Sequence, residues 1–238
     1  MEDNNFKVWP IGKLPREWQR PELEQLRANG CEFEDPREVV SLFEQKLARY
    51  AGAPHAVAVD NCTDAVFLCL QHLIHKGELS LGDTITIPKR CYLSVPMAVK
   101  LCGLTVAFEE RAWSGTFQLK PTQVHDGAVR FTEGMYIPGA LQCTSFQIKK
   151  RLPIGKGGMI FTDDEEAETW FRQASFEGRH LEKDQWHDEF EILGWNMYMT
   201  PEDAARGLLI FDQLPRTNED SGCQDNYPDL STQKIFRS

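Results

Sequence analysis

Two adjacent lysines stand between an apolar run and a glycine-rich turn. Lys149 and Lys150 follow the alternating run 141–148, and three glycines within 155–158 precede a second apolar run at 159–162. Glycine accepts the positive φ values of tight turns, so the pattern predicts a strand, a turn and a returning strand. A lysine amine placed this way can bond covalently to a carbonyl group. The alternative, from this segment alone, is that both lysines are solvated at the end of a hairpin.

A second candidate site is a strand that runs through a polar turn into a helix. Residues 55–60 are typical of a short buried strand, residues 61–64 of a polar turn, and residues 65–74 of an apolar helix. The unpaired N–H groups and the positive dipole end of such a helix can hold a phosphate, and Thr63 adds a hydroxyl. The alternative is that the polar residues of the turn only cap the helix.

Two further side chains are expected at the ends of strands. Tyr92 follows the strand 84–87, and the strand 124–128 carries Asp126, an aspartate in an apolar setting that needs a partner. Strands that alternate with helices predict an α/β fold with a mainly parallel sheet and helices on both faces. Ligands of such sheets bind at the carboxyl ends of the strands, so these residues are expected at one edge.

The chain of 238 residues divides, by composition, into an arm, one domain and a tail. Residues 1–34 combine prolines with tryptophans and charges, which indicates an N-terminal arm that lies across a surface. The α/β domain is expected over 35–215, starting with an amphipathic helix that has Asp35 as N-cap and Pro36 at its first position. Residues 216–238 are predicted to form an irregular tail held only by its last apolar residues.

Between these boundaries the pattern predicts a helix within 91–101, a strand at 104–108 and a helix that ends near Phe176. Residues 178–193 are charged and irregular, and Thr200 with the following proline predicts the start of another helix.

The formal charge of −10, with 41% hydrophobic and 26% charged residues, predicts a soluble protein whose main partner is neither nucleic acid nor an anionic membrane. The first residues do not resemble a secretory signal and no apolar run reaches membrane-spanning length, so a cytoplasmic location is expected. The seven cysteines are odd in number and form no C-x-x-C pair, which predicts reduced thiols. No metal site is expected, because His180 and His187 lack further ligands.

In chain order, these segments resemble the sugar aminotransferases of the DegT/DnrJ/EryC1/StrS family, which use pyridoxal 5′-phosphate (PLP) on the fold type I scaffold. The phosphate turn of the family is similar to residues 60–65, and its Gly-Asp strand to residues 82–88. Its acidic segment is similar to 125–128, its lysine signature to 145–158, and its Gly-x-Asn loop to 194–199. The resemblance therefore covers most of the chain and implies a large PLP-binding domain.

The resemblance also assigns roles. It selects Lys150, not Lys149, as the lysine that bonds to the cofactor and moves a proton, and it places Asp126 against the pyridine nitrogen, where a carboxylate keeps that nitrogen protonated. Tyr92 would stack on the ring, and Asn196 would reach the phosphate of a neighbouring subunit. The remaining cofactor contacts implied are Cys62, Thr63, Asp64, Ala128 and Ser145.

The implied activity is transfer of an amino group from an amino acid to a keto sugar, expected to be nucleotide-linked, by a homodimer in which residues 194–199 complete the partner's site. Trp195, Met197 and Met199 would then be covered by the partner, and the alternative is that they pack within their own subunit. Two other functions stay open: a PLP-binding scaffold or regulatory homologue without catalysis, and a PLP-dependent sugar dehydratase.

The chain departs from the family in several places. The link between Phe108 and Asp126 is short, which predicts fewer strands, and no full C-terminal small domain is expected. Lys156 stands where the signature has glutamate, Tyr198 where it has arginine, and Val129 where a polar residue often touches substrate.

Overall fold

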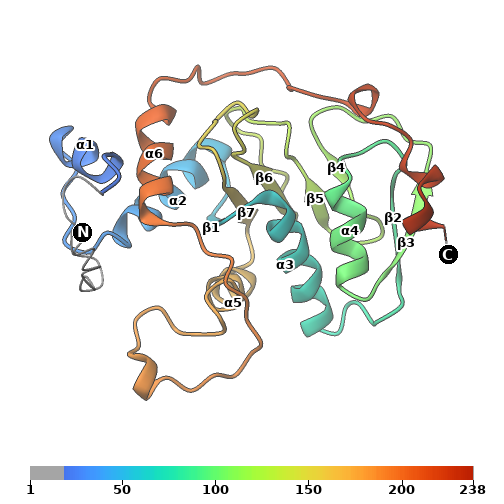
Figure 1. Cartoon of the computed structure of the whole chain (residues 1–238), viewed down its shortest axis with the longest axis horizontal. Helices are drawn as coiled ribbons and strands as arrows, with labels where there is room; N and C mark the ends of the chain where they lie inside the picture. Colours follow the sequence, from blue (N-terminus) through green and yellow to red (C-terminus); the bar gives the residue numbers. More distant parts are fainter. Residues whose placement is uncertain (1–18, 238) are drawn as a thin grey trace, which may run out of the picture.

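The structure, a computed structural model, describes residues 19–237. It alternates strands and helices along most of its length (Figure 1). The elements are α1 (Glu22–Ala28), α2 (Glu38–Ala51), β1 (His55–Val59), α3 (Cys62–His75), β2 (Thr84–Pro88), α4 (Ser94–Leu101), β3 (Thr105–Glu109), β4 (Phe117–Gln118), β5 (Val124–Asp126), β6 (Leu141–Ser145), β7 (Gly158–Thr162), α5 (Glu165–Ser175) and α6 (Pro201–Phe211).

The strands form a five-stranded sheet in the order β1-β7-β6-β5-β4 and a parallel pair β2-β3. Thr86 of β2 bridges to Lys120, just beyond β4, and this bridge brings the pair beside the larger sheet. The α/β class is confirmed, with β5 and β6 parallel, but β7 is antiparallel to both β1 and β6, and β4 is antiparallel to β5. Strands β1, β5 and β6 therefore run in the same direction, and the mainly parallel sheet is confirmed, with β7 and the two-residue β4 as its antiparallel strands.

Helices cover both faces of the sheet, as the sequence predicts. Alternate residues of β1 point to opposite sides: Val57 and Val59 lie in a core with α3, α4 and α5, while Ala56 and Ala58 lie in a core with α2 and α6. The short strand β4 lies within the link that the sequence pattern left unassigned. The buried sheet thus holds the ends of β1, β5 and β6 in fixed positions.

The start of α2 differs from the prediction. The helix begins at Glu38 rather than at Pro36, and Asp35 is not its N-cap. The Asp35 carboxylate instead accepts a hydrogen bond from the Arg37 N–H at 2.9 Å, and the Glu38 carboxylate accepts one from the Asp35 N–H at 2.7 Å. A side-chain turn before the helix therefore takes the place of the predicted cap. The cap of α6 is confirmed, since the Thr200 hydroxyl accepts a hydrogen bond from the Asp203 N–H.

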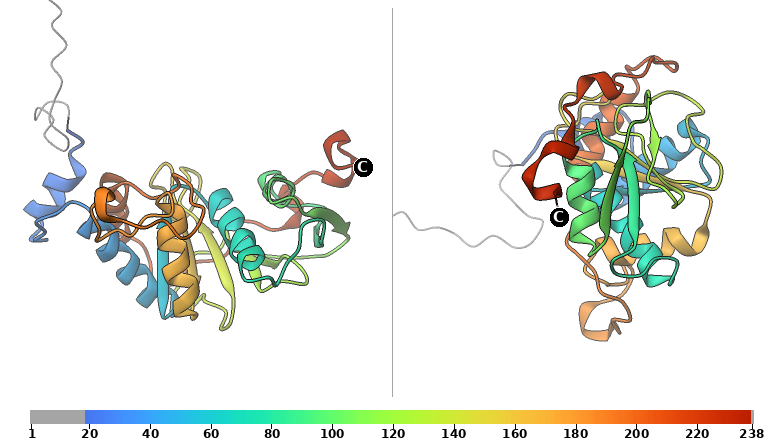
Figure 2. Two further views of the ribbon diagram at one scale, coloured as in Figure 1. Left: turned by 90° about the horizontal axis from the view of Figure 1, so that it is seen from below. Right: turned by 90° about the vertical axis from the view of Figure 1, so that its right-hand side faces the viewer.

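The two ends of the described chain lie at opposite sides of the molecule (Figure 1). Helix α1 packs against α6, and Arg20 forms an ion pair with Asp203 at 2.8 Å. Residues 1–18 of the predicted arm lie outside the described residues. The tail runs from α6 to the β2-β3 pair, where Leu230 is buried and the Phe236 ring meets Phe108 at 5.6 Å (Figures 1 and 2). The tail is thus held by more than its last apolar residues.

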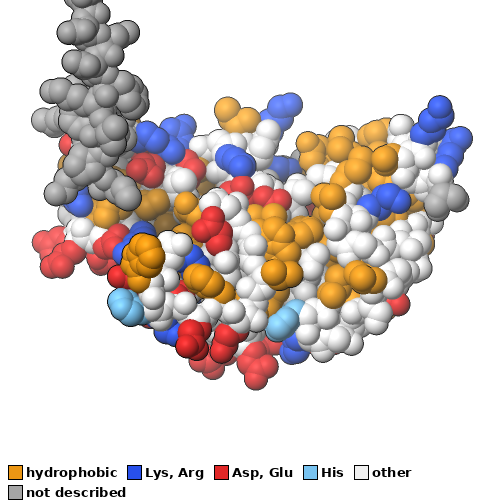
Figure 3. Space-filling view, turned by 60° about the horizontal axis from the view of Figure 1, so that its bottom comes forward, with side chains coloured by type: hydrophobic (Ala, Val, Ile, Leu, Met, Phe, Trp, Pro, Cys, Tyr) orange, Lys and Arg blue, Asp and Glu red, His pale blue; other side chains and the backbone are white. Residues whose placement is uncertain are grey.

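Charged side chains are scattered over the surface. On the face shown in Figure 3, lysine and arginine do not merge into one basic area, and apolar side chains form several separate patches. Within residues 19–237, no helix has the length and apolar character needed to cross a bilayer.

Candidate active site

A cavity of about 590 Å³ opens where β1, β5 and β6 end. Seven of the nine predicted site residues line it, and they come from four separate segments of the chain. Two predicted residues do not line it: Asp64 lies in the first turn of α3, next to the lining residue Thr63, and Asn196 lies elsewhere. The seven residues that the fold brings together are Cys62, Thr63, Tyr92, Asp126, Ala128, Ser145 and Lys150.

One end of the cavity is the N-terminus of α3. Asn61 caps this helix, and its side-chain oxygen accepts a hydrogen bond from the Asp64 N–H at 2.9 Å. Within the described chain, no hydrogen bond is formed by the N–H groups of Cys62 and Thr63. The β7 hairpin passes so close that a side chain on Gly158 would lie 2.5 Å from the backbone of Asn61. This end therefore offers free N–H donors and a positive dipole to an anion.

Asp126 lies at the floor of the cavity, at the end of β5. Its side chain is buried, and one carboxylate oxygen accepts a hydrogen bond from the Ala128 N–H at 2.8 Å. No described residue donates a hydrogen bond to the other oxygen. Burial raises the pKa of Asp126, opposed by the Ala128 N–H and by the charge of Lys150. A cationic N–H donor bound in the cavity would supply the missing hydrogen-bond partner of this carboxylate.

Three lysines also line the cavity, Lys149, Lys150 and Lys156. The backbone N–H of Lys150 donates to the Gln147 carbonyl at 2.8 Å, and that of Lys149 donates to the Gln147 side chain at 2.8 Å, so a turn fixes both lysines after β6. Lys156 pairs with Asp60 at 2.7 Å. In the described part of the chain, no ion pair is formed by Lys149 or Lys150, so both amines stay available in the cavity.

The pair of Lys156 and Asp60 belongs to a polar network at the start of α3. The Asn61 amide donates to Asp60 at 3.0 Å and to Asp64 at 2.6 Å. Burial, followed by the interaction with Asp60, raises the pKa of Asp64 to about 7. The lysine that replaces the glutamate of the family signature is thus held beside the anion end of the cavity.

Another part of the cavity lining is aromatic and polar, and most of its residues carry no signal in the sequence. Tyr92 is 56% exposed and meets Tyr227 edge-on, with 6.4 Å between ring centroids. Ser221, Asn226 and Tyr227 belong to the tail, yet they line the cavity. No periodic pattern surrounds them, and the only signal was a tyrosine within a polar, turn-rich segment. Val129, the position where the family often has a polar residue, also lines the cavity.

The loop that follows α5 lies away from this cavity. Asn196 donates to Glu177 at 2.9 Å, and Tyr198 packs against the Phe176 ring at 5.1 Å. The expectation that Trp195, Met197 and Met199 await cover by a partner is wrong for this structure. Met199 is buried, Met197 packs partly buried against the core, and Trp195 packs against the Phe67 ring at 5.1 Å. The alternative, packing within the subunit, holds because the segment lies along β1.

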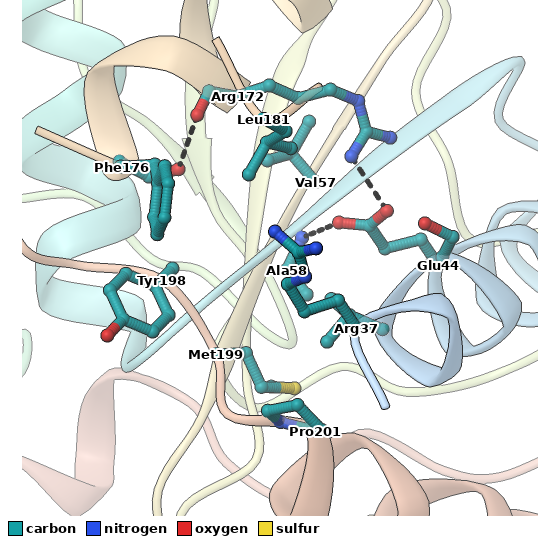
Figure 4. A pocket seen from close by; sticks show the side chains of 13 residues that line it. Arg37, Glu44, Val57, Ala58, Arg172, Phe176, Leu181, Tyr198, Met199 and Pro201 are labelled. Atoms are coloured by element: carbon teal, nitrogen blue, oxygen red, sulfur yellow. Dashed lines mark hydrogen bonds and ion pairs between the residues drawn. The ribbon is translucent and has the colours of Figure 1, made fainter. Parts of the chain in front are cut away.

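A smaller cavity of about 120 Å³ lies between α2, β1 and the loop after α5 (Figure 4). It contains none of the predicted site residues. Its buried carboxylate, Glu44, accepts hydrogen bonds from the Ala58 N–H at 2.7 Å and from Arg172 at 2.8 Å (Figure 4). Each carboxylate oxygen has a partner, so Glu44 serves to join α2 to β1 and α5.

The cysteines and histidines of the described residues form neither a disulfide nor a metal site. All seven cysteines are free, although the sulfur atoms of Cys69 and Cys143 lie 3.6 Å apart. Residues 19–237 hold no group of three or more histidine, cysteine or acidic side chains arranged to bind a metal. His180 pairs with Asp188 at 2.6 Å.

The fold is that of PLP-dependent aminotransferases. The sugar aminotransferase CalS13 of Micromonospora echinospora superposes with a TM-score of 0.62 at 14% identity, over 81% of this chain and 64% of that one. The E. coli GDP-4-keto-6-deoxy-D-mannose-3-dehydratase with bound hydrated PLP superposes with a TM-score of 0.64 at 16% identity, over 84% of this chain and 66% of that one.

The chain belongs to the DegT/DnrJ/EryC1/StrS aminotransferase family, whose model matches residues 22–136 and 137–222. It is similar to the spore coat polysaccharide biosynthesis protein SpsC of Bacillus subtilis, at 28% identity over 89% of this chain and 65% of the relative. It is also similar to GDP-perosamine synthase of Caulobacter vibrioides, at 25% identity over 82% of this chain and 61% of the relative. The chain thus spans less than two thirds of the length of these relatives.

Proposed function

We propose that this chain carries the cofactor site of a PLP-dependent sugar aminotransferase, with Lys150 and Asp126 as its catalytic residues. The observation that carries the proposal is one cavity that holds an unpaired lysine, a buried aspartate and the free N–H groups of a helix start. These three features come from separate segments, and each serves a different part of the same cofactor.

The donor set fits PLP. The N–H groups of Cys62 and Thr63, with the Thr63 and Ser145 hydroxyls, suit a phosphate, and the free oxygen of Asp126 suits a protonated ring nitrogen. The exposed ring of Tyr92 offers a stacking surface. Asp64 would act at the phosphate end indirectly, through Asn61.

When bound, the cofactor would supply an aldehyde for the amino group and an electron-accepting ring. Lys150 would bond to that aldehyde and later carry a proton to and from the substrate carbon, as an amine without an ion-pair partner can do. Asp126 would hold the proton on the ring nitrogen, since its own carboxylate lacks a second partner. The buried floor around Asp126 limits access of water to this contact.

For substrates, we propose an amino acid donor and a nucleotide-linked keto sugar acceptor. Two observations support this assignment: the relatives named GDP-perosamine synthase, and a cavity of about 590 Å³, which lies within the usual range of ligand pockets. Lys149, which forms no ion pair within the described residues, gives the cavity positive charge for a diphosphate.

The test compares two matched substitutions of neighbouring lysines. The chain is incubated with PLP and reduced with borohydride, and intact and peptide mass spectrometry locate the adduct. Lys150→Arg should abolish the adduct and Lys149→Arg should retain it, because both keep the positive charge and only Lys150 is assigned the bond. An adduct that persists in Lys150→Arg, or one that disappears only in Lys149→Arg, would contradict the assignment.

A dehydratase is the second candidate, favoured by the E. coli dehydratase that shares the fold. Product mass separates the two reactions, because an aminotransferase replaces oxygen by an amino group whereas a dehydratase removes water. Conversion of the PLP form to the pyridoxamine form by glutamate, without any sugar, would also exclude the non-catalytic scaffold.

We further propose a homodimer through the segment 178–199, of which the part before Gly194 projects from the body of the molecule (Figure 1). Its support is the exposure of Trp186, Phe190 and Leu193, at 90%, 56% and 85%. Asn196 lies off its own cavity, as a residue that serves a partner's site would. Light scattering tests the assembly, and a monomer that binds PLP tightly would contradict it.

A further inference from the structure

The residues 219–230, here named the strap, close one side of the large cavity. The strap crosses the short link after β3 through backbone hydrogen bonds, from Gly115 N–H to the Gly222 carbonyl at 3.1 Å and from the Gln224 N–H to the Trp113 carbonyl at 3.3 Å. The strap therefore runs beside the short link that follows β3.

A charged clasp fixes the strap at its start. Arg130 binds Asp220 through two nitrogens, at 2.9 and 2.8 Å, and the Ser114 hydroxyl donates to the same carboxylate at 3.3 Å. Asp220 sits so close to Gly115, at φ +70°, that a side chain there would lie 2.2 Å from the Asp220 carboxylate. A bidentate pair seated against a glycine indicates a defined docking position for the strap.

The strap presents neutral polar groups to the cavity. Tyr227 stacks on Trp113 at 5.7 Å, and its carbonyl accepts a hydrogen bond from Arg90 at 3.3 Å, so its ring is fixed. No described residue forms a hydrogen bond with its hydroxyl. Asn226 uses its side-chain oxygen to accept from the Cys223 N–H at 2.8 Å, which leaves its amide N–H groups free.

The two walls of the cavity therefore differ in charge. The hairpin wall carries Lys149, Lys150 and Lys156, whereas the strap offers a hydroxyl and an amide beside the exposed ring of Tyr92. Neutral donors and acceptors next to an aromatic face suit a ring that bears hydroxyl groups, while ammonium groups suit phosphates.

We propose that the strap is the wall that holds the sugar ring of the acceptor, with Tyr227 and Asn226 as specificity-determining residues. This inference rests on the proposed function of the same cavity. It assigns to the tail a role that no motif of the chain indicates.

The test measures how much a sugar adds to nucleotide affinity. Calorimetry compares GDP-mannose with GDP, and dTDP-glucose with dTDP, on the PLP-treated chain. Tyr227→Phe keeps the ring on Trp113 and removes only the hydroxyl, and Asn226→Asp keeps the oxygen that binds Cys223 and removes the amide donor. Asp225→Asn is the control, since Asp225 is exposed on the same strap and does not line the cavity.

Both variants should lose about fivefold to tenfold in affinity for a nucleotide sugar that binds the parent chain, as expected for one hydrogen bond. Tyr227→Phe should keep its affinity for the nucleotide within about twofold, and Asn226→Asp, which adds a negative charge, should lose less affinity for the nucleotide than for the nucleotide sugar. Asp225→Asn should match the parent. Equal losses for sugar and nucleotide, unchanged affinities in both variants, or a parent chain that gains nothing from the sugar would overturn the proposal. Borohydride adducts at Lys150, measured on the same samples, report separately on the cofactor site.

Discussion

Two cavities of this molecule each contain a buried carboxylate, and the two carboxylates differ in how they are paired. Glu44 has a donor on each oxygen, from Ala58 and Arg172, whereas Asp126 has one donor and one free oxygen that faces no described donor. Burial raises the pKa of both groups. A buried charge with a full set of partners stabilises packing, and one with an open position is arranged for a ligand.

Among substitutions that test this comparison, Asp126→Asn is expected to have the largest effect on the reaction rate. The asparagine keeps the oxygen that accepts from Ala128 but cannot hold a proton on the cofactor nitrogen, so the glutamate half-reaction should slow on the order of 100-fold. Stability should stay within about 1 kcal/mol of the parent or rise, because a costly buried carboxylate is removed. Stopped-flow absorbance and urea unfolding measure the two quantities. A rate within twofold of the parent would remove Asp126 from the catalytic assignment.

The matched change in the smaller cavity is Glu44→Gln, which should show the reverse pattern. The amide still accepts from the Ala58 N–H, but the half-buried Arg172 loses its charge partner on α2 and keeps only Glu168. The free energy of unfolding should fall by about 1 to 2 kcal/mol, since Arg172 keeps Glu168, while PLP adduct formation at Lys150 stays unchanged. Urea unfolding and borohydride mass spectrometry check both. A loss of adduct at full stability would mean that the two cavities are coupled.

Local sequence patterns predict one part of the large cavity and not the other. The strand, turn and helix at residues 55–75 and the hairpin at 141–162 follow from local periodicity and glycine placement, so most of the cavity was placed from them. Tyr227 and Asn226 reach the cavity only because long-range contacts with Trp113 and Gly115 hold their segment there, and no local pattern predicts those contacts.

The error at the start of α2 has a local cause. The start of α2 was misplaced because Asp35 forms a side-chain turn that imitates a cap. The predicted hairpin at 141–162 already sets the direction of β7 against β6, whereas the pairing of β7 with β1 is a tertiary contact that periodicity does not specify.

The smallest effect concerns the helix start, where Asp64 faces Asp60, Asn61 and the ammonium group of Lys156. Its pKa is raised from 3.8 to about 7, so the folded state keeps a proton there that the unfolded state loses. Asp64 therefore contributes stability below pH 3.8, and that contribution is lost as pH rises to about 7. Above that pH its negative charge also opposes a phosphate at the α3 N-terminus.

PLP affinity should consequently fall by about threefold more between pH 6 and pH 8 in the parent chain than in Asp64→Asn, which stays neutral throughout. Absorbance titration with PLP measures the affinity of both proteins at both pH values. Effects of pH on the bond to the lysine are common to the two proteins, so they do not contribute to the difference between them. Asp83→Asn, a change at an exposed aspartate outside the cavity, is the control. If the parent and Asp64→Asn show the same pH dependence, the proton on Asp64 has no part in phosphate binding, and the anion end of the cavity is defined by the α3 N–H groups alone.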